Sequence, residues 1–225
     1  IKVVSLKLFI SGGGALDKNI GIFLNAIGLP TLQGYGLTET SPVVSCNPKD
    51  DIRVETVGPP FSANKVKIAD DGEILVKGEN VMLGYWNNKE ETNKVLKDGW
   101  LYTGDIGFFK DNYLQITDRK KDIIITPGGD NISPVKIETE ITNSYLFDQA
   151  IVYGDNKPYL VALLVLNNDI ILNDEKKIEL EIERINKKLS KIENIKKFFV
   201  IKEKFSIENG MLTPTLKLKR FKIVN

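Results

Sequence analysis

Residues 33–40 read QGYGLTET and bring together three side chains that suit a nucleotide. Glycines on both sides of Tyr35 leave its ring free to stack on a heterocycle. The hydroxyl of Thr38 can donate a hydrogen bond to a phosphate oxygen, and the carboxylate of Glu39 is a hard oxygen ligand for Mg²⁺. The alternative is a glycine-bracketed loop in which Tyr35 packs inward, and the octet alone does not separate the two interpretations.

A second glycine-rich segment, SGGGA at residues 11–15, follows a strand expected over residues 2–10. Consecutive glycines let a backbone approach a flat or phosphorylated ligand closely, although a plain tight turn explains them equally well. Asp17 is placed to cap the helix that follows, on which the apolar residues Ile20, Phe23, Leu24 and Ile27 share one face.

Five charged residues in a row, Asp118-Arg119-Lys120-Lys121-Asp122, lie between expected strands. Before them, strands at 106–110 and 113–117 are joined by Asp111-Asn112, a pair that favours a tight turn. Asp105 stands at the strand–loop junction ahead of this hairpin. Most charge clusters are exposed turns, but a cluster between two folding units can also be a hinge.

The tail segment TPTLKLKR, residues 213–220, places Lys217, Lys219 and Arg220 on a proline-containing stretch with no acid nearby. Such a tail is either a solvated end or a mobile arm that meets an anion. Lys120, Lys219 and Arg220 taken singly are expected to be solvated cations.

Composition limits the chemistry. The 225 residues include no histidine, which excludes a Ser-His-Asp triad, a His-Cys pair and a His-ligated metal. Cys46 is the single cysteine, so no internal disulfide can form and a cytoplasmic location is expected. The net charge of +1 gives no reason to expect a nucleic acid partner, and no apolar run approaches the ~20 residues that span a bilayer.

The remaining pattern predicts a mixed α/β (α+β) fold. Up to the charged cluster, short strands without intervening helices predict a small, distorted β-barrel or open sheet. The pattern after the cluster predicts helix–strand–strand–helix–strand, a second small unit. The predicted elements are a helix at 88–96, a helix starting at Ser133-Pro134, a helix through Ile178, Ile182, Ile185, Leu189 and Ile192, and strands at 53–57, 65–69, 73–77, 123–126, 149–153, 159–166 and 197–201.

Taken together, six blocks in order resemble the adenylate-forming (acyl-activating, AMP-binding) superfamily, within it the long-chain fatty-acid–CoA ligases. The blocks are SGGGALD (11–17), QGYGLTET (33–40), GEILVKGENVMLGYW (72–86), GWLYTGDIG (99–107), ITDRKKDIIITPGGDNISP (116–134) and TPTLKLKR (213–220). The resemblance implies that residues 1–118 are the end of a large N-terminal adenylation domain with a β-barrel-like subdomain. Residues 119–225 would form a small mobile α+β domain, with a hinge near 119–122.

The resemblance also implies roles for individual residues. Thr38 would contact the α-phosphate, Glu39 would bind Mg²⁺, and Lys217 would be the catalytic lysine that bridges the acyl carboxylate and the α-phosphate. Lys121 matches the hinge position. The thiol channel would include Gly128 and Gly129, and the ATP/AMP contacts would come from Gly13, Gly14, Ala15, Gly34, Tyr35, Gly36, Asp105 and Arg119.

The implied reaction joins a fatty acid to CoA through an acyl-adenylate, with ATP converted to AMP and pyrophosphate. An ionised carboxylate needs no general base in the first step, which agrees with a chain without histidine. An insoluble substrate would bring the enzyme to the inner face of a membrane as a peripheral protein. No sequence feature sets an oligomeric state.

One departure from the family pattern is large. Family members carry a Ser/Thr/Gly-rich phosphate loop well upstream of the SGGG block, and the chain has no such loop. We therefore expect the chain to be the last third of such an enzyme. Two alternatives stay open: a ligase that loads a carrier protein instead of CoA, and a non-catalytic remnant that binds nucleotide.

Overall fold

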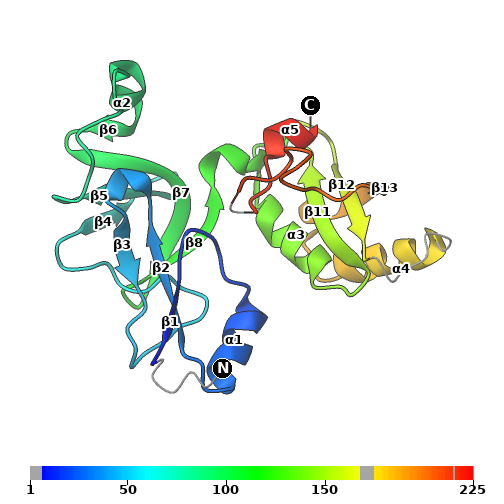
Figure 1. Ribbon diagram of the computed structural model, residues 1–225. Coiled ribbons are helices and arrows are strands. Elements are labelled where there is room, and N and C mark those ends of the chain that lie inside the picture. The colour runs from blue at the N-terminus through cyan, green and yellow to red at the C-terminus, as the bar shows by residue number, and fades with distance from the viewer. Residues whose placement is uncertain (1–6, 168–174, 215, 225) are drawn as a thin grey trace. The chain divides into compact units, whose positions relative to one another are not determined.

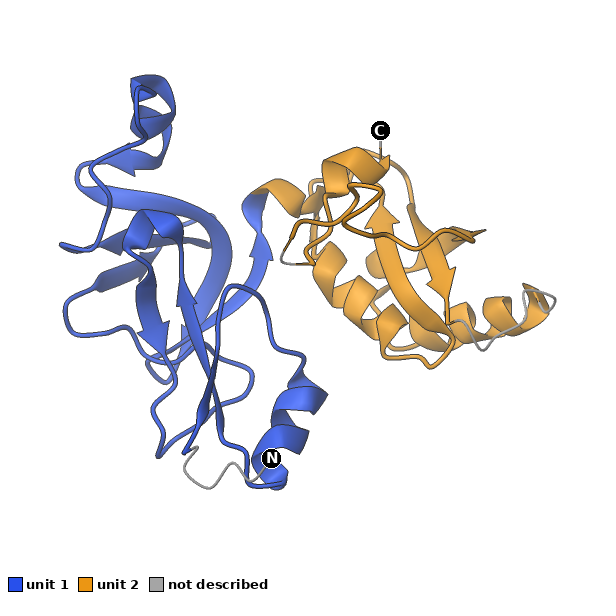
Figure 2. Cartoon of the chain, viewed as in Figure 1, with its two compact units in different colours: residues 1–120 blue, residues 121–225 orange. Residues whose placement is uncertain are grey.

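The computed structural model describes residues 7–167, 175–214 and 216–224, and the chain divides into two compact units, 1–120 and 121–225 (Figures 1 and 2). Residues 2–6 of the first predicted strand lie outside the described residues. Among the described helices, none is long and apolar enough to cross a bilayer.

The first sheet of unit 1 has three strands in the order β1 (Phe9–Ser11), β2 (Thr31–Gly36) and β3 (Val43–Cys46). The crossover from β1 to the parallel β2 contains helix α1 (Lys18–Ala26), which Asp17 caps by accepting a hydrogen bond from the Ile20 amide at 2.9 Å. β1 pairs with the first half of β2, and β2 continues through Gly36 because β3 pairs with its second half, so the first half of the octet is strand. A short 3-10 turn, η1 (Thr38–Thr40), follows.

The second sheet of unit 1 is built from hairpins. Its path is β4 (Lys65–Ile68), β5 (Glu73–Lys77), β7 (Trp100–Lys110) and β6 (Leu96–Lys97), with β8 (Tyr113–Arg119) also paired to β7. The predicted hairpin at 106–117, the predicted strands at 65–69 and 73–77, which pair with each other, and the predicted helix, α2 (Lys89–Val95), are confirmed. Asp111 and Asn112 have φ values of 48° and 67°, as the tight turn requires. Figure 1 shows β7 as a long, curved strand.

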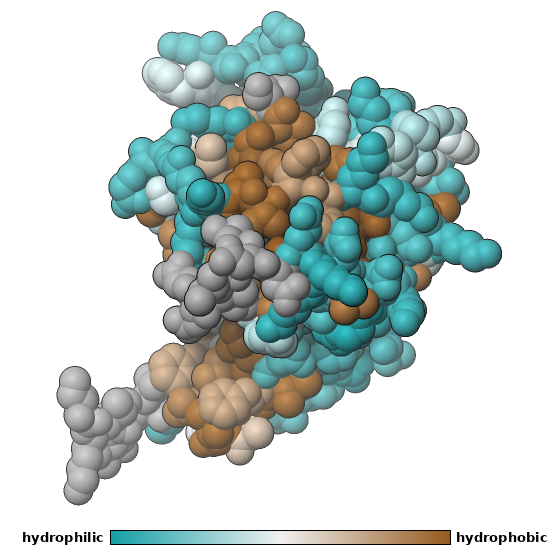
Figure 3. Space-filling view, turned by 90° about the vertical axis from the view of Figure 1, so that its right-hand side faces the viewer, coloured by the Kyte–Doolittle hydropathy of each residue, from teal (hydrophilic) through white to brown (hydrophobic). Residues whose placement is uncertain are grey.

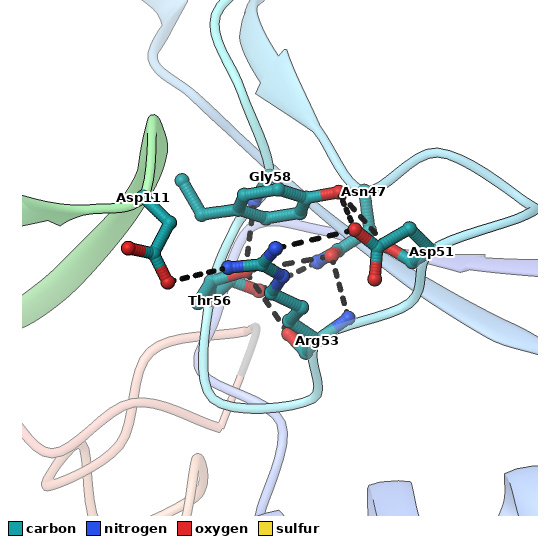
Figure 4. Close-up of polar contacts among 7 residues, drawn as sticks. Asn47, Asp51, Arg53, Thr56, Gly58 and Asp111 are labelled. Atoms are coloured by element: carbon teal, nitrogen blue, oxygen red, sulfur yellow. Dashed lines mark hydrogen bonds and ion pairs between the residues drawn. The ribbon is translucent and has the colours of Figure 1, made fainter.

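The strand predicted at 53–57 is wrong, because side chains fold this segment into a turn (Figure 4). Asn47 accepts from the Arg53 amide at 3.0 Å and donates to the Thr56 carbonyl at 2.7 Å. The Arg53 guanidinium lies 4.0 Å from the Tyr113 ring centroid and pairs with Asp51. These contacts satisfy the backbone groups that a strand would have offered to a neighbouring strand.

Unit 2 begins with η2 (Lys120–Asp122), which straddles the boundary, and a two-stranded ribbon, β9 (Ile124–Ile125) and β10 (Asn131–Ile132). Its main sheet has the order β11 (Phe147–Tyr153), β12 (Leu160–Leu166), β13 (Ile195–Ile201), and β11 is an edge strand. Helices α3 (Pro134–Thr142) and α4 (Glu175–Asn186) supply the core on one face, including Ile137 and Ile182. The predicted order of elements is confirmed.

The helix predicted to reach Ile192 ends instead at Asn186. The Asn186 side chain accepts from the Ile195 amide at 2.8 Å and donates to the Ile195 carbonyl at 2.9 Å, which draws the chain toward β13. Leu189 still packs against the core from the turn, whereas Ile192, in η3 (Lys191–Glu193), is half exposed. The helical spacing of apolar residues therefore continues beyond the end of α4 and does not mark where the helix ends. β9 is also shorter than the predicted 123–126 strand.

The tail is neither a solvated end nor a free arm within unit 2. Leu212 and Leu218 form an antiparallel bridge, and both belong to a cluster with Ile151 and Val165 on the sheet face opposite α3. Helix α5 (Arg220–Val224) follows. The tail therefore builds the second core of unit 2.

Some apolar side chains are not buried. Ile20, Phe23 and Ile27 on the predicted apolar face of α1 are each more than half exposed. Figure 3 shows hydrophobic areas at the molecular surface beside hydrophilic ones. An apolar helix face of this kind is available for contact with another part of the protein or with a partner.

We expect Ile137→Ala to destabilise unit 2 by about 2–5 kcal/mol, because it leaves a cavity under α3. Ile137 has no exposed surface, whereas Val135 on the same helix is 41% exposed. Hydrogen exchange of the β12 amides measures the effect, with Val135→Ala as the matched control. Equal protection in both variants would contradict this description of the core.

Candidate nucleotide site

A buried carboxylate lies at the centre of the candidate site. Asp105 on β7 is 3% exposed. Its Oδ2 accepts a 2.7 Å hydrogen bond from the Tyr35 hydroxyl, and its Oδ1 lies 2.6 Å from the Nε of Arg119. Asp105 and Arg119 are direct partners in the β7–β8 register, so the sheet itself holds the pair. The structure thus brings together three of the predicted site residues.

The partners of Asp105 also explain how its charged carboxylate can be buried. The Arg119 cation compensates a carboxylate that would otherwise be costly to bury. Burial and the negative charge of Asp105 raise the pKa of Tyr35 well above its usual value, so the hydroxyl remains a donor. The Tyr35 ring packs in a core cluster with Val44 and Ile74. This is the inward packing that the sequence of residues 33–40 allowed as an alternative. Adenine stacking by Tyr35 stays a prediction.

The glycine loop and the octet lie at one edge of the first sheet. β1 and β2 are parallel, so their carboxyl ends lead into residues 12–15 and 37–40 on the same side. Leu16 donates to the Gln33 side chain at 3.2 Å, which ties the loop to β2. The segment through Gly13, Gly14 and Ala15 is exposed. This edge can therefore receive a ligand, as carboxyl edges of parallel strands commonly do.

Gly34 and Gly36 are held inside β2 by close neighbours. A Cβ on Gly36 would overlap the Pro42 carbonyl, and a Cβ on Gly34 would touch the Ser45 carbonyl. Strand packing against β3 therefore requires a glycine at position 36, whereas a Cβ on Gly34 would lie at an ordinary contact distance of 3.4 Å. Direct nucleotide contact by these two glycines stays a prediction.

Glu39 has a partner that the sequence did not indicate. The Tyr85 hydroxyl donates to Glu39 Oε1 at 2.8 Å. Burial and the Glu39 charge raise the pKa of Tyr85 to about 12. Tyr85 belongs to the GYW end of a matched block, but no residue pattern assigned it a contact.

The setting of Glu39 fits Mg²⁺. The second carboxylate oxygen has no hydrogen bond to Tyr85, and the neighbouring Thr38 is exposed. No cluster of three or more potential metal-ligating side chains occurs in the part of the chain that the structure describes. Mg²⁺ is commonly bound by one or two carboxylates together with substrate phosphates and water, so a single Glu39 is chemically sufficient.

Lys120 is not the solvated cation that we predicted. Its Nζ donates to Asp71 Oδ2 at 2.5 Å and to Glu73 Oε2 at 2.8 Å. These hydrogen bonds raise the pKa of Lys120 to about 12. Glu73 also accepts from the Gly104 amide, next to Asp105. The last residue of unit 1 is therefore fixed to the β4–β5 hairpin.

The other predicted site residues belong to unit 2. Lys121 is exposed at the first position of this unit. Gly128 and Gly129 are exposed in the turn between β9 and β10, where Gly129 has φ 87°. Lys217 is exposed on the tail loop, and its amide donates to the Thr213 hydroxyl at 3.0 Å.

Comparison with known protein families matches both units. Residues 2–86 match the model described as AMP-binding enzyme, and residues 121–213 match its C-terminal domain. The chain belongs to the AMP-binding enzyme family. It is 37% identical over 94% of its length to the long-chain-fatty-acid–CoA ligase FadD15 of Mycobacterium bovis, and it spans 39% of that protein.

Solved structures of family members have the same fold. O-succinylbenzoate coenzyme A synthetase from Bacillus subtilis, in complex with AMP, has a TM-score of 0.82 and 27% identity, covering 98% of this chain and 46% of that one. The same enzyme with its acyl-adenylate intermediate has a TM-score of 0.83 and 28% identity, covering 99% and 46%. The chain thus spans less than half the length of these family members.

We expect Tyr35→Phe to reduce the free energy of unfolding of unit 1 by about 1–3 kcal/mol, because buried Asp105 loses a donor. Denaturant unfolding followed by the fluorescence of Trp100, on the same strand as Asp105, measures the change. Tyr102→Phe, at a half-buried position of β7, is the control and should change stability by no more than about 0.5 kcal/mol. Equal stability of the two variants would show that the Tyr35 hydroxyl does not support Asp105.

Proposed function

We propose that the protein to which this chain belongs is a long-chain fatty-acid–CoA ligase that works through an acyl-adenylate. The observation that carries the proposal is the buried Asp105 carboxylate, held by Tyr35 and Arg119 in an AMP-binding fold. The name of the FadD15 relative supports the choice of long-chain fatty acid and CoA.

Asp105 is suited to hold the ribose. Tyr35 and Arg119 orient the carboxylate within unit 1, and a carboxylate is a natural acceptor for two hydroxyl groups. The two ribose hydroxyls would donate to it. Because the carboxylate is already fixed, little side-chain entropy is lost when the nucleotide binds.

The neighbouring loops would hold the base and the phosphates. The exposed backbone of residues 13–15 would line the adenine pocket, with Tyr35 closing it from β2. The Thr38 hydroxyl would donate to an α-phosphate oxygen, and Glu39 would bind Mg²⁺. When bound, Mg²⁺ neutralises phosphate charge.

In the first step a carboxylate oxygen of the fatty acid attacks the α-phosphorus of ATP. The oxygen–phosphorus bond forms as the bond to pyrophosphate breaks. Lys217 would place its ammonium between the carboxylate and the α-phosphate, because both are negative and repel each other. Lys217 is exposed, and its amide is held by the Thr213 hydroxyl, which is compatible with this role.

In the second step the CoA thiol loses its proton to solvent, its sulfur attacks the acyl carbon, and AMP leaves with the electrons of the acyl–oxygen bond. Unit 2 would rotate at Lys121 between the steps, which removes Lys217 and presents Gly128 and Gly129 to the thiol. The fixed Lys120 and the exposed Lys121 support a pivot between these two residues.

We expect Lys217→Ala to lower the rate of acyl-adenylate formation by at least about 100-fold, because a charge contact made in the transition state is lost. Thioester formation from supplied acyl-adenylate and CoA should stay within a few-fold of the unchanged protein. Pyrophosphate release and acyl-CoA formation measure the two steps in the full-length protein.

Lys219→Ala, two residues along the same tail, is the matched control and should retain adenylation. A full-length protein that forms no adenylate from any fatty acid would contradict the proposed function. Equal loss of both steps in Lys217→Ala would contradict the role of Lys217 alone.

A further inference from the structure

Arg220, predicted as a solvated cation, is instead half of a largely buried ion pair. Its NH1 donates to Glu138 Oε1 at 2.8 Å and its NH2 to Glu138 Oε2 at 2.7 Å. The two side chains are 19% and 10% exposed. This two-point geometry fixes direction as well as distance, which a lysine cannot do.

The pair also closes the edge of the main sheet of unit 2. Val152 lies on the edge strand β11, where its amide donates to Glu138 Oε1 at 2.7 Å. The Val152 carbonyl accepts from Arg220 NH1 at 3.0 Å. Glu138 comes from α3, so the pair joins the tail, a helix and a strand at one point. Since Arg220 bonds both to Glu138 and to the strand backbone, its position is set relative to the whole unit.

Arg220 lies three residues after Lys217, and the tail between them is held tightly. The Thr213 amide donates to the Lys217 carbonyl at 2.8 Å, and the Lys217 amide donates to the Thr213 hydroxyl at 3.0 Å. Leu218 packs in the second core, and the Lys219 amide donates to the Met211 carbonyl at 2.8 Å. Lys217 is therefore at the exposed end of a closed loop, and Arg220 anchors the outgoing side of that loop.

We propose that Arg220 is a positioning residue for the adenylation step, which it serves by fixing the Lys217 loop to Glu138 and β11. This inference rests on the proposed function of Lys217. Both Glu138 oxygens and the Val152 carbonyl engage the guanidinium, so Arg220 acts through Lys217 and does not contact the substrate. A buried pair contributes little net stability but specifies one arrangement, which is what a loop carrying a catalytic lysine requires.

The test uses Arg220→Met in the full-length protein, with Arg220→Lys and Glu138→Gln as conservative variants. Misplacing a reacting group by about 1 Å costs on the order of 100-fold in rate, so kcat for adenylation should fall by about this factor in Arg220→Met. The KM for ATP and the rate of thioester formation from supplied acyl-adenylate should each change less than about threefold, since neither depends on the Lys217 loop. Arg220→Lys should recover little activity, because it cannot bond both carboxylate oxygens at once.

Hydrogen exchange gives a readout that does not require activity. The amides of residues 212, 213 and 216–219 should exchange faster in Arg220→Met and Glu138→Gln, and by a larger factor than the amides of β12. The tail loses its anchor, whereas β12 responds only to the loss of a buried ion pair. Lys188→Met, which breaks a more exposed ion pair with Glu140 in the same unit, is the control and should alter neither exchange nor adenylation.

Three results would overturn the positioning role. These are full adenylation activity in Arg220→Met, equal loss of both half-reactions, and unchanged exchange of the tail. If the unchanged protein forms no adenylate, the proposed function is wrong, and the positioning role is wrong with it. Faster tail exchange in Arg220→Met would then show only that Arg220 anchors the tail.

Discussion

A buried carboxylate on a curved strand is the constraint on which unit 1 depends. Asp105 has almost no exposed surface, so its charge needs partners inside the protein. Tyr35, 70 residues earlier in the chain, and Arg119, across the β7–β8 ladder, provide them. The same contacts connect the two sheets and place residues 37–40, the half of the octet that follows β2. A side-chain requirement at one carboxylate thus fixes where the proposed nucleotide-binding loops lie.

The ends of the two units follow the same physical rule. Basic side chains that the sequence predicted to be solvated are instead paired with acidic residues from distant segments. Lys120 pairs with Asp71 and Glu73 in unit 1, and Arg220 pairs with Glu138 in unit 2. Lys120 is next to Lys121, the proposed hinge residue, and Arg220 is three residues after Lys217, the proposed catalytic lysine. Lys121 and Lys217 are exposed beside these anchors.

Sequence predicts the parts of this structure that depend on neighbouring residues. The cap at Asp17, the turn at Asp111-Asn112 and the helix start at Ser133-Pro134 are each determined within a few residues, and the structure has all three. The six blocks indicated the family because each is a contiguous pattern. The contact between Tyr35 and Asp105 was not predicted, although both residues were placed at the nucleotide.

The features that sequence did not predict depend on side-chain contacts that span six residues or more. The apolar spacing through Ile192 gave no sign that Asn186 would bond to β13. Similarly, Arg53 has strand-like neighbours, but Asn47 and Tyr113 determine its turn. The partners of Lys120, Arg220 and Glu39 come from segments 46 to 82 residues away. A spacing pattern contains no information on such pairs.

The proposed contact between Asp105 and the ribose of the nucleotide can be tested by a binding cycle. Calorimetric titration of the full-length protein and of Asp105→Ala would compare ATP with 2′-deoxy-ATP. We expect loss of the 2′-hydroxyl to cost the unchanged protein about 1–2 kcal/mol of binding free energy and to cost Asp105→Ala almost nothing, because the acceptor is already absent. An equal penalty in both proteins would place the ribose away from Asp105.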